Sequence, residues 1–522
     1  MLLDRLVETS RAVQATRRRK EKVERLAHLL RGLEGDERTI GAHLLAGSLR
    51  QGRIGIGHAT VARTTRVPAA PAPKLSLVDV DRALSQIVDT AGQGSAKRRL
   101  AQLEGLLARA TRAEQDFLRR VLVGEIRQGA LEGVLVEAAA AATGLDPARV
   151  RRARMLSGDL ALVVQAALTE GARGLERFQL SVFTPVHPML ASTAAGVEDA
   201  LTKLGEAALE WKLDGARVQI HRSGEEVRVY SRRLNEVTAA VPEVVELARR
   251  LPVRSGIWDG ETLALGPQRR PLPFQATMRR YGRKLDVERL RAELPLSTFL
   301  FDALLLDDEP LVDLDGEARH ERLAIAPASV RIPRTVTGDP ELADAFVADA
   351  LATGHEGVMA KSLRAPYEAG RRGAGWLKLK PAHTLDLVVI AVEWGSGRRQ
   401  GWLSNLHLAC RDATTGELVM LGKTFKGLTD ELLAWQTQAL LQREIRREGH
   451  VVHVRPELVV EIALDGIQQS PHYPGGLALR FARVKRYRAD KSPGEASTLA
   501  EVRVLADGRA SEEAGRAAPD GL

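Results

Sequence analysis

One lysine of this sequence stands among residues that suit it for nucleophilic chemistry. Lys212 lies in the segment Glu-Trp-Lys-Leu-Asp-Gly, and Arg217 follows shortly after. Side chains alternate along a β-strand, so Glu210 and Lys212 share one face while Trp211 and Leu213 face the core. A lysine amine attacks only when neutral, and desolvation, a nearby cation such as Arg217 or a bound metal lowers its pKa. The segment predicts a lysine displayed in a pocket, although taken singly it also fits a plain hairpin turn.

Further motifs of charged and aromatic residues follow this lysine in a fixed order. They are Ser231-Arg232-Arg233, Asp259-Gly-Glu261, Phe301-Asp302, Glu356-Gly-Val-Met-Ala-Lys361, Trp376-Leu-Lys378-Leu-Lys380 and Arg488-Ala-Asp490-Lys491. The ordered set resembles the covalent nucleotidyltransferase superfamily. The whole chain resembles an ATP-dependent DNA ligase of the type that has a helical DNA-binding domain before its catalytic core.

The resemblance implies a covalent role for Lys212. In this family the matching lysine attacks the α-phosphate of ATP, forms lysyl-AMP and releases pyrophosphate. Glu210 is implied to hydrogen-bond the adenine amino group, while Arg217 and Arg232 are implied to bind ribose, phosphate and later the nick. Phosphoryl transfer depends mostly on positioning and on neutralising spread negative charge, and arginine suits phosphate oxygens.

Two carboxylates and one aromatic residue complete the implied nucleotide site. Glu261 is implied to lie near the ribose and a metal ion, and Glu356 at the metal, for which Mg²⁺ is expected and Mn²⁺ is the alternative. Phe301 matches the aromatic residue that stacks on adenine. Taken singly, either acid fits a surface ion pair and the phenylalanine fits a core position, but their order in the sequence favours the site.

Basic residues near the end of the catalytic region are expected to hold the α-phosphate. Lys378 and Lys380 alternate with leucines, so a strand places both ammonium groups on one face. These two charges repel unless an anion lies between them. Arg372 matches another nucleotide-contacting position of the family. Strict alternation from Glu356 turns Lys361 to the opposite face, which leaves its role open.

Two other segments also have open roles. Arg319-His320 stands where relatives often have two arginines, so we assign no phosphate contact there. Arg488-Ala-Asp490-Lys491 matches a motif that swings onto ATP, orients pyrophosphate as the leaving group and then swings away. A charged surface cluster is the alternative interpretation of this second segment.

The residues before about position 200 indicate a helical domain. Apolar residues recur there at three- and four-residue intervals with charges on the other face, as in an amphipathic bundle. Arg50-Gln-Gly and Arg127-Gln-Gly begin two glycine turns, which would bring backbone amides together with Arg50, Arg53 and Arg127 against DNA phosphates. Helix ends with solvated arginines are the alternative.

Downstream of Leu209 the hydrophobic pattern changes to the period of two that is typical of strands. Helical segments at 241–250 and 340–353 interrupt these strands, so an α+β region is expected. From Thr384 onward, short strands predict a β-barrel of the OB type. The predicted fold is a multidomain α and α+β chain, with an all-helical DNA-binding domain at 1–200, an adenylation (nucleotidyltransferase) domain at 201–383, an OB-fold domain at 384–506 and a mobile tail at 507–522.

The composition of the 522 residues excludes several classes of protein. Hydrophobic residues make up 44% and charged residues 27%, which argues against global disorder. The single cysteine, Cys410, excludes an internal disulfide framework and a CxxC zinc site. No apolar run approaches the length of a membrane helix and the first residues lack a signal-peptide pattern, so we expect a soluble, cytoplasmic protein. The formal net charge of +9 favours a polyanionic partner.

The predicted function is that of an ATP-dependent DNA ligase that seals nicks through lysyl-AMP and a 5′-adenylated DNA intermediate, in replication, recombination or repair. Its expected partners are nicked double-stranded DNA and ATP, and we expect a monomer without membrane attachment; the sequence identifies no sliding clamp or repair protein. An mRNA capping enzyme or RNA ligase is the nearest alternative, against which Glu210 and the helical region argue. One cysteine excludes the zinc module of NAD-dependent ligases, and the intact lysines argue against a nonenzymatic DNA-binding scaffold.

Overall fold

The structure is a computed structural model that describes residues 1–52, 54–126, 131–281, 286–368, 372–380, 383–396 and 399–507, without the side chains of Leu131, Pro267, Arg372, Ala374 and Asp507. The predicted contacts of Arg53, Arg127 and the Arg372 side chain, and residues 508–522 of the predicted tail, lie outside the described residues. Contacts between residues divide the chain into two units, Met1–Leu379 and Lys380–Leu522.

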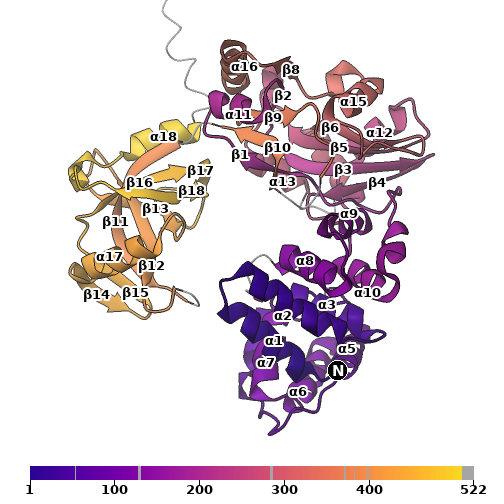
Figure 1. The fold of residues 1–522 in the computed structure, drawn as a ribbon. Helices are drawn as coiled ribbons and strands as arrows, with labels where there is room; N and C mark the ends of the chain where they lie inside the picture. Colours follow the sequence, from indigo (N-terminus) through magenta and orange to yellow (C-terminus); the bar gives the residue numbers. More distant parts are fainter. Residues whose placement is uncertain are drawn as a thin grey trace, which may run out of the picture. The chain divides into compact units, whose positions relative to one another are not determined.

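The first unit begins with a series of α-helices, as the apolar periodicity predicts (Figure 1). They are α1 (Leu3–Ala15), α2 (Arg19–Arg31), α3 (Glu37–Ala46), α4 (His58–Arg63), α5 (Leu77–Asp89), α6 (Ser95–Ala108), α7 (Arg112–Leu122), α8 (Leu131–Thr143), α9 (Pro147–Ser157) and α10 (Leu160–Glu176). In α5, for example, Leu77, Val80, Leu84 and Ile87 form the buried face. Across the described ranges, every helix is too short or too polar to span a membrane.

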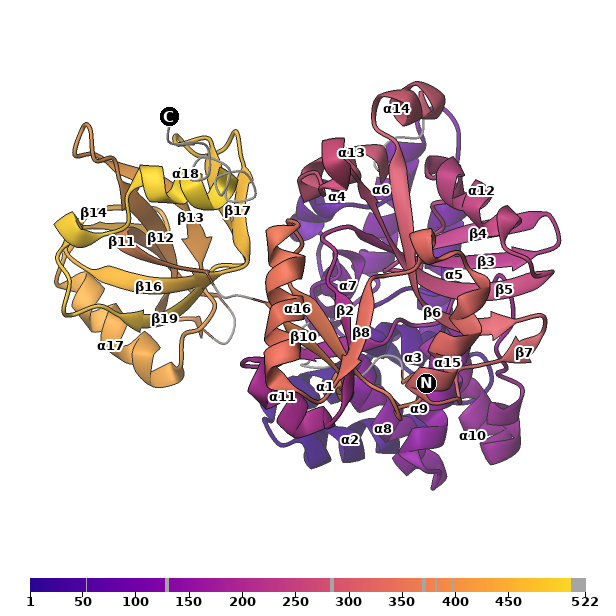
Figure 2. The same ribbon diagram turned by 90° about the horizontal axis from the view of Figure 1, so that it is seen from above.

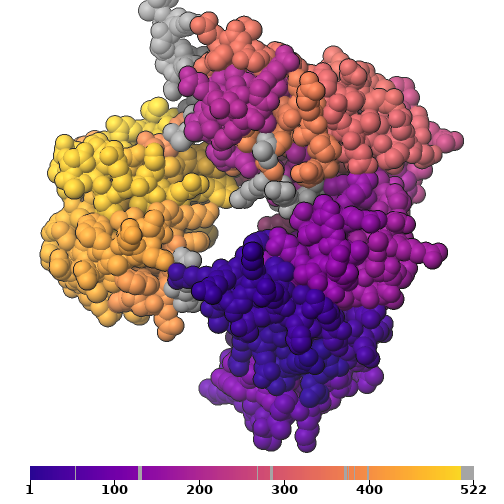
Figure 3. Space-filling model, viewed as in Figure 1, coloured from indigo at the N-terminus to yellow at the C-terminus, as the bar shows by residue number. Residues whose placement is uncertain are grey.

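Local sequence signals determine where some of these helices begin. Ser76 and Thr111 each accept a hydrogen bond from the backbone N–H three residues later, and the acids Asp79 and Glu114 accept one in return. These capping boxes start α5 and α7. The apolar faces then join one core of buried leucines, valines and alanines. On the face drawn in Figure 3, the indigo and violet side chains of the helices form a continuous surface over that core.

Two five-stranded sheets follow within the same unit (Figure 2). The first has the order β1-β10-β9-β2-β8 and consists of β1 (Leu190–Thr193), β2 (Ala207–Trp211), β8 (Arg334–Thr337), β9 (Val358–Ser362) and β10 (Arg372–Leu379). The second has the order β4-β3-β5-β6-β7 and consists of β3 (Ala216–Ser223), β4 (Glu226–Ser231), β5 (Ser255–Ala264), β6 (Leu296–Leu306) and β7 (Glu309–Pro310). The α+β region predicted from the period-two segments is therefore confirmed.

Helices cover both sheets. α11 (Val197–Leu204) and α16 (Pro340–Ala352) bury small apolar residues against the first sheet, and Figure 2 shows α16 beside β2 and β8. α12 (Pro242–Arg250) packs its buried Val244 and Ala248 into the core of the second sheet. The remaining helices of the region are α13 (Phe274–Tyr281), α14 (Val287–Glu293) and α15 (Gly316–Arg322).

The sheets already use residues that precede position 200. β1 pairs in parallel with β10. Upstream of β1, the Phe183 N–H donates to His221 Nδ1 over 2.9 Å and the Val186 N–H donates to Gln219 Oε1 over 2.7 Å. Both acceptors lie on β3, so the two-sheet region requires the chain from about residue 183 onward.

The second unit is rich in strands. They are β11 (His383–Trp394), β12 (Leu403–Arg411), β13 (Leu418–Thr424), β14 (Glu444–Glu448), β15 (Val451–Val454), β16 (Val459–Leu464), β17 (Gly466–Gln469), β18 (Leu477–Arg480) and β19 (Arg483–Tyr487), with helices α17 (Asp430–Leu441) and α18 (Leu499–Asp507). The main sheet runs β13-β12-β11-β15-β14, while β16 joins β11 to β19. Within the described residues β13 and β14 remain edge strands, so the strand pairing does not close the predicted barrel.

Candidate active site

Lys212 directly follows β2, and the backbone holds it against Glu356. The Lys212 N–H donates to the Gly357 carbonyl over 2.8 Å, and the Glu356 N–H donates to the Lys212 carbonyl over 3.0 Å. The side chains also meet, because Lys212 Nζ forms an ion pair with Glu356 Oε2. The Lys212 side chain is 24% exposed, so its amine is accessible. The structure thus brings together the predicted nucleophile and one predicted metal-binding acid.

Gly357 breaks the alternation that we assumed between Glu356 and Lys361. Its φ of 134° belongs to a region that glycine adopts readily and other residues rarely do. The register of β9 is set instead by its pairing with β2, in which Ala208 lies opposite Lys361. Strict alternation therefore does not apply here, and Lys361, whose role the sequence leaves open, pairs with Glu210: its ammonium lies 2.5 Å from Glu210 Oε2.

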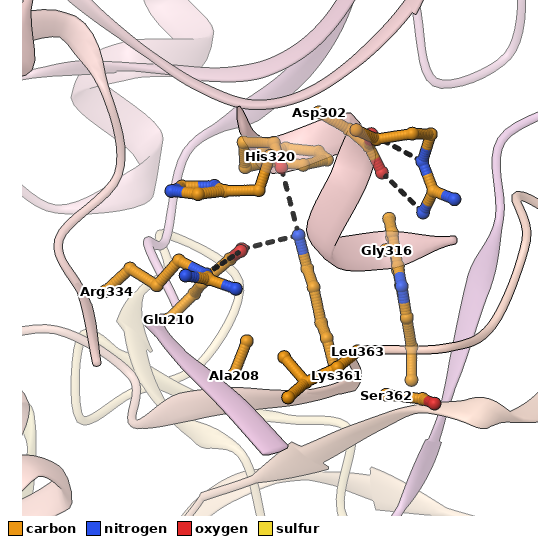
Figure 4. Close-up of a pocket in the computed structure, with 12 residues that line it drawn as sticks. Ala208, Glu210, Asp302, Gly316, His320, Arg334, Lys361, Ser362 and Leu363 are labelled. Carbon is orange, nitrogen blue, oxygen red and sulfur yellow. Dashed lines mark hydrogen bonds and ion pairs between the residues drawn. The ribbon is translucent and has the colours of Figure 1, made fainter. Parts of the chain in front are cut away.

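A pocket lies beside Glu210, and residues of both sheets line it. Figure 4 shows the Lys361 side chain pointing toward Glu210, and its ammonium also donates to the Phe301 carbonyl over 3.2 Å. The same ammonium lies 4.7 Å from the Phe301 ring centroid and 4.4 Å from that of Trp376, which are cation–π distances. The lining consists of Ala208, Glu210, Phe301, Asp302, Gly316, Arg319, His320, Arg334, Lys361, Ser362, Leu363 and Trp376. The acid and the aromatic residue predicted to contact adenine therefore share one pocket.

The Glu210 carboxylate is almost completely buried, at 4% exposure. Burial raises its pKa, and the ammonium of Lys361 opposes that rise most strongly. Arg334 adds a weaker positive field, with its Nε 4.0 Å from Glu210 Oε1. Lys361 therefore favours the ionised Glu210, which only accepts hydrogen bonds.

Arg217 lies on β3 in a network of buried polar groups. Its Nη2 donates to Asp259 Oδ2 over 2.8 Å and to the Tyr367 hydroxyl over 3.2 Å, while Nη1 donates to the Met189 carbonyl over 2.7 Å. Burial alone would lower the pKa of Arg217, but the charge and hydrogen bond of Asp259 together with the charges of Tyr367 and Glu261 outweigh this and raise it. No motif in the sequence indicated Tyr367, which donates to Asp259 over 2.6 Å. This network holds the guanidinium 5.2 Å from the Phe301 ring centroid.

Glu261 lies on β5 directly opposite Arg217. Burial raises the pKa of Glu261 to about 7; Lys212 and Arg217 lower it, while the carboxylates of Asp214 and Glu356 raise it. Carboxylates that share a site repel one another, and a divalent cation with its preference for oxygen ligands relieves that repulsion. The surroundings of Glu261 therefore fit a cation.

Metal affinity is expected to depend on pH through Glu261. Because the carboxyl group must lose its proton to bind a cation, affinity for Mn²⁺ should rise about tenfold per pH unit and level off above about pH 7. Paramagnetic resonance titrations of the protein with a nonhydrolysable ATP analogue, whose phosphates complete the ligand set, measure this dependence, and Glu261→Gln should abolish it. An unchanged slope in the variant assigns the proton to another group.

By linkage, the raised pKa of Glu261 stabilises the fold below pH 4.5, and this contribution is lost as the pH rises through about 7.

The other predicted basic residues lie in different surroundings. Arg232 is exposed on the turn after β4, where it makes no ion pair or hydrogen bond with another described residue. Lys378 lies on β10, two residues after the pocket-lining Trp376 and thus on the same face. Lys380 begins the second unit, and its Nζ lies 2.6 Å from Asp465. Their contacts with phosphate stay predictions.

Arg319 and His320 have separate environments. Arg319 is 2% exposed and donates to the two carboxylate oxygens of Asp302 over 2.9 and 3.3 Å. The guanidinium of Arg319 is therefore paired with a carboxylate inside the protein. His320 lines the pocket beside Glu210, and burial lowers the pKa of its imidazole to about 4. The pocket therefore has a neutral imidazole wall near pH 7.

The Arg50-Gln-Gly turn is tied to its own domain. Arg50 Nε donates to Asp81 Oδ1 over 3.0 Å, and Gln51 Nε2 donates to the same oxygen over 2.7 Å. Gly52 follows with a φ of 66°. The Arg50 side chain is nevertheless 47% exposed, so its contact with DNA phosphates stays a prediction.

The charged motif near the C-terminus forms an internal cluster in the second unit. Arg488 Nη1 donates to Asp386 Oδ2 over 2.9 Å, and Lys491 Nζ donates to the same oxygen over 2.7 Å. Arg488 Nη2 also donates to Asp490 Oδ2 over 2.7 Å. Asp386 therefore pairs with both cations of the motif, and together with Asp490 it balances their charge.

Family models match three parts of the chain. One described as ATP dependent DNA ligase domain matches residues 188–380, one described as ATP dependent DNA ligase C terminal region matches 399–491, and one described as DNA ligase N terminus matches 58–140. These segments include the two-sheet region with Lys212, most of the strand-rich unit and part of the helical region.

Similar proteins match nearly the whole chain. A probable DNA ligase of Anaeromyxobacter sp. (strain Fw109-5) is 59% identical over 97% of this chain and 98% of the relative. A probable DNA ligase of Anaeromyxobacter dehalogenans (strain 2CP-1) is 60% identical over 97% of this chain and 100% of the relative. The solved structure Pmar-Lig_PreS3 is 18% identical and has a TM-score of 0.61 over 92% of this chain and 99% of that chain, so the two share a fold. The chain therefore belongs to the family of ATP-dependent DNA ligases.

Proposed function

We propose that this protein seals nicks in duplex DNA with ATP, through an adenylate on Lys212. The observation that carries the proposal is the placement of Lys212. Its accessible amine meets Glu356, and two residues earlier on the same face Glu210 shares a pocket with Phe301. A nucleotide with its base beside Glu210 would present its phosphates to the amine.

The reaction consists of three transfers of a phosphoryl group. Neutral Lys212 Nζ forms a bond to the α-phosphorus of ATP while the bond to pyrophosphate breaks, and the surplus Nζ proton leaves to solvent or a carboxylate. The AMP then moves from Nζ to the 5′-phosphate of the nick, which restores the amine. Finally the 3′-hydroxyl attacks that 5′-phosphate, the phosphodiester bond forms and AMP leaves.

The ion pair with Glu356 has to open before Lys212 attacks, because a paired carboxylate stabilises the protonated amine. A divalent cation bound by Glu261 and Glu356 would neutralise phosphate charge and compete with Lys212 for the carboxylate. No group of three His, Cys, Asp or Glu side chains within the described ranges could hold a metal by itself. Phosphate oxygens and water would therefore complete the ligand set.

The hydrogen-bonding groups beside Glu210 suit adenine better than guanine, and the cavity, of about 10 Å³, has to widen to admit a base. An ionised Glu210 accepts the hydrogen bond that the adenine amino group donates, whereas guanine presents a carbonyl oxygen at that edge and two acceptors repel. Phe301 supplies a face for stacking, and Lys361 keeps Glu210 ionised. The phosphates would contact the predicted basic residues Arg217, Arg232, Arg372, Lys378 and Lys380. For Lys380 this contact requires release from Asp465.

Nicked DNA is the proposed polymer substrate, and the net charge of +9 supports binding to its phosphates. We assign the helical region to DNA binding, the two-sheet region to adenylation and the strand-rich unit to a domain of the OB type, with boundaries near residues 183 and 383. The protein is proposed to act as a cytoplasmic monomer.

Labelling with radioactive ATP or GTP tests the proposal. The full-length protein, incubated with Mg²⁺ and either nucleotide and separated on a denaturing gel, should carry label from ATP only. Sealing of a nicked duplex in the same reaction should require ATP. Label from GTP, or label without sealing, contradicts the proposal.

Asp490→Ala and Lys491→Ala are expected to slow lysyl-AMP formation about 100-fold while changing the sealing of an already adenylated nick much less. Pyrophosphate has to be held in line only in the first step, and these residues are its proposed contacts. Single-turnover rates with ATP and with 5′-adenylated nicked DNA measure the two effects.

The matched control removes a charge outside this cluster. Glu431→Ala changes an exposed acid at the start of α17 and should leave both rates unchanged. If Asp490→Ala and Lys491→Ala slow both steps equally, the motif acts on stability and the pyrophosphate role fails.

A further inference from the structure

A second cavity lies on the other side of the Lys212 segment from the Glu210 pocket. Its volume is about 560 Å³, a size typical of small-molecule sites. Its lining includes the apolar residues Trp211, Leu213 and Phe299 and the basic residues Arg269, Arg270 and Arg331. The residues that line it include no aspartate or glutamate. This combination favours an anion that carries an aromatic ring.

Two buried N–H groups of the lining lack an acceptor. Trp211 Nε1 and Arg331 Nε have no hydrogen-bond partner in the part of the chain that the structure describes. Buried donors in native proteins are nearly always paired, so an unpaired one requires a reason. A ligand with acceptor oxygens or ring nitrogens would pair both groups.

The basic part of the lining includes a strained turn. Gln268 and Arg269 are consecutive residues with φ values of 60° and 61°, a left-handed conformation that non-glycine residues seldom adopt. The Gly266 N–H closes the turn by donating to the Arg270 carbonyl over 2.8 Å. Backbone strain of this kind persists only where the surrounding structure enforces it, and it is found often at ligand sites. Here the strained turn presents Arg269 and Arg270 to the cavity.

The cavity adjoins the catalytic ion pair through the neighbouring residues in the chain. Trp211 and Leu213 flank Lys212, and His355 precedes Glu356; all three line the cavity. The rings of Trp211 and His355 have centroids 4.8 Å apart. A ligand against these rings would contact both segments that hold Lys212 and its partner.

We propose that this cavity binds a nucleoside monophosphate, with its base against Trp211 and its phosphate against the arginines, and that binding slows adenylation of Lys212. The effect on rate follows because a ligand that packs against both segments holds Lys212 in its ion pair with Glu356 and so keeps the amine from a phosphate. The nucleotide comes either from solution, as the AMP released by sealing, or from an unpaired nucleotide of the DNA. The effect on rate rests on the proposed function, whereas binding does not.

Equilibrium dialysis with radiolabelled AMP tests binding. The full-length protein is first adenylated on Lys212, which fills the first pocket, and intact mass confirms the loading. One further AMP should bind each loaded chain. Failure to load contradicts the proposed function, while loading without further AMP removes free nucleotide as the occupant of the cavity.

A second arm tests the DNA source. A nicked duplex with one unpaired nucleotide that carries a photoreactive base should crosslink to the peptide containing Trp211. The same base within a fully paired duplex should not. Crosslinking without AMP binding assigns the cavity to DNA, and AMP binding alone assigns it to the free nucleotide. Absence of both overturns the proposal.

Arg331→Ala and Arg269→Ala are expected to weaken the observed binding about tenfold each, because each removes a charged fork from the phosphate. Arg331→Lys should recover part of the loss. Arg289→Ala, which changes an exposed arginine of α14, is the matched control and should bind like the wild type. Wild-type binding in both cavity variants overturns the assignment, and circular dichroism checks their folding.

Discussion

Lys212→Arg is expected to reduce formation of the covalent adenylate more than about 1,000-fold, as loss of a nucleophile does in other covalent enzymes. The guanidinium keeps the positive charge next to Glu356 but does not release a proton near neutral pH, so no free electron pair attacks the α-phosphorus. A denaturing gel after incubation with radiolabelled ATP and Mg²⁺ measures the effect. Sealing of a nick that already carries 5′-AMP should persist, because that step does not pass through the amine.

Lys203→Arg is the matched control for this experiment. Lys203 is also paired with a carboxylate, at 2.6 Å from Asp199 Oδ2, but it belongs to α11 on the surface. This variant should form the adenylate at the wild-type rate. A covalent adenylate of normal yield in Lys212→Arg would mean that another residue is the nucleophile.

Glu356→Ala is expected to slow lysyl-AMP formation about 100- to 1,000-fold at saturating Mg²⁺, with a much smaller change in ATP affinity. The carboxylate acts where charge develops on the phosphate and where the proposed cation binds, whereas the base is bound at the Glu210 pocket. Single-turnover rates and nucleotide binding, measured on the same preparation, separate the two effects.

Glu356→Gln and Glu341→Ala complete that experiment. The glutamine retains the shape of the side chain but loses its charge, so it should remain nearly as slow as alanine if charge is what matters. Glu341 is an exposed acid in the first turn of α16, and its replacement should have no effect. Wild-type rates in Glu356→Ala at saturating Mg²⁺ would remove this residue from the site.

Local patterns in the sequence predicted the helical region before residue 200, several of the strands and the family. The period of apolar residues reports which face of a segment is buried, and this holds for α5, whereas the strands on either side of Lys212 are buried on both faces. The motifs predicted the chemistry because phosphoryl transfer requires specific side chains in short segments. The contacts of Lys212, Glu210 and Phe301 are consistent with that chemistry, although their roles await the experiments above.

Residue pairs far apart in the chain were decided by the tertiary structure alone. Lys361 reaches Glu210 because β9, which begins directly after Gly357, pairs with β2. The register of this pair places Lys361 opposite Ala208. Arg319 on α15 pairs with Asp302, which lies earlier in the chain on β6. Each of these contacts depends on which strands become neighbours, and the periodicity of one segment does not encode its neighbour.

The strand-rich unit shows the same division. Its alternating segments correctly indicated strands, but whether a set of strands closes into a barrel depends on the pairing of its edges. Within the described residues β13 and β14 remain unpaired edges. Sequence by itself determined the types of element and the reactive groups of this protein, because both are local properties of the chain. Strand register, burial and the partner of each charge required the tertiary structure, because they depend on packing between distant segments.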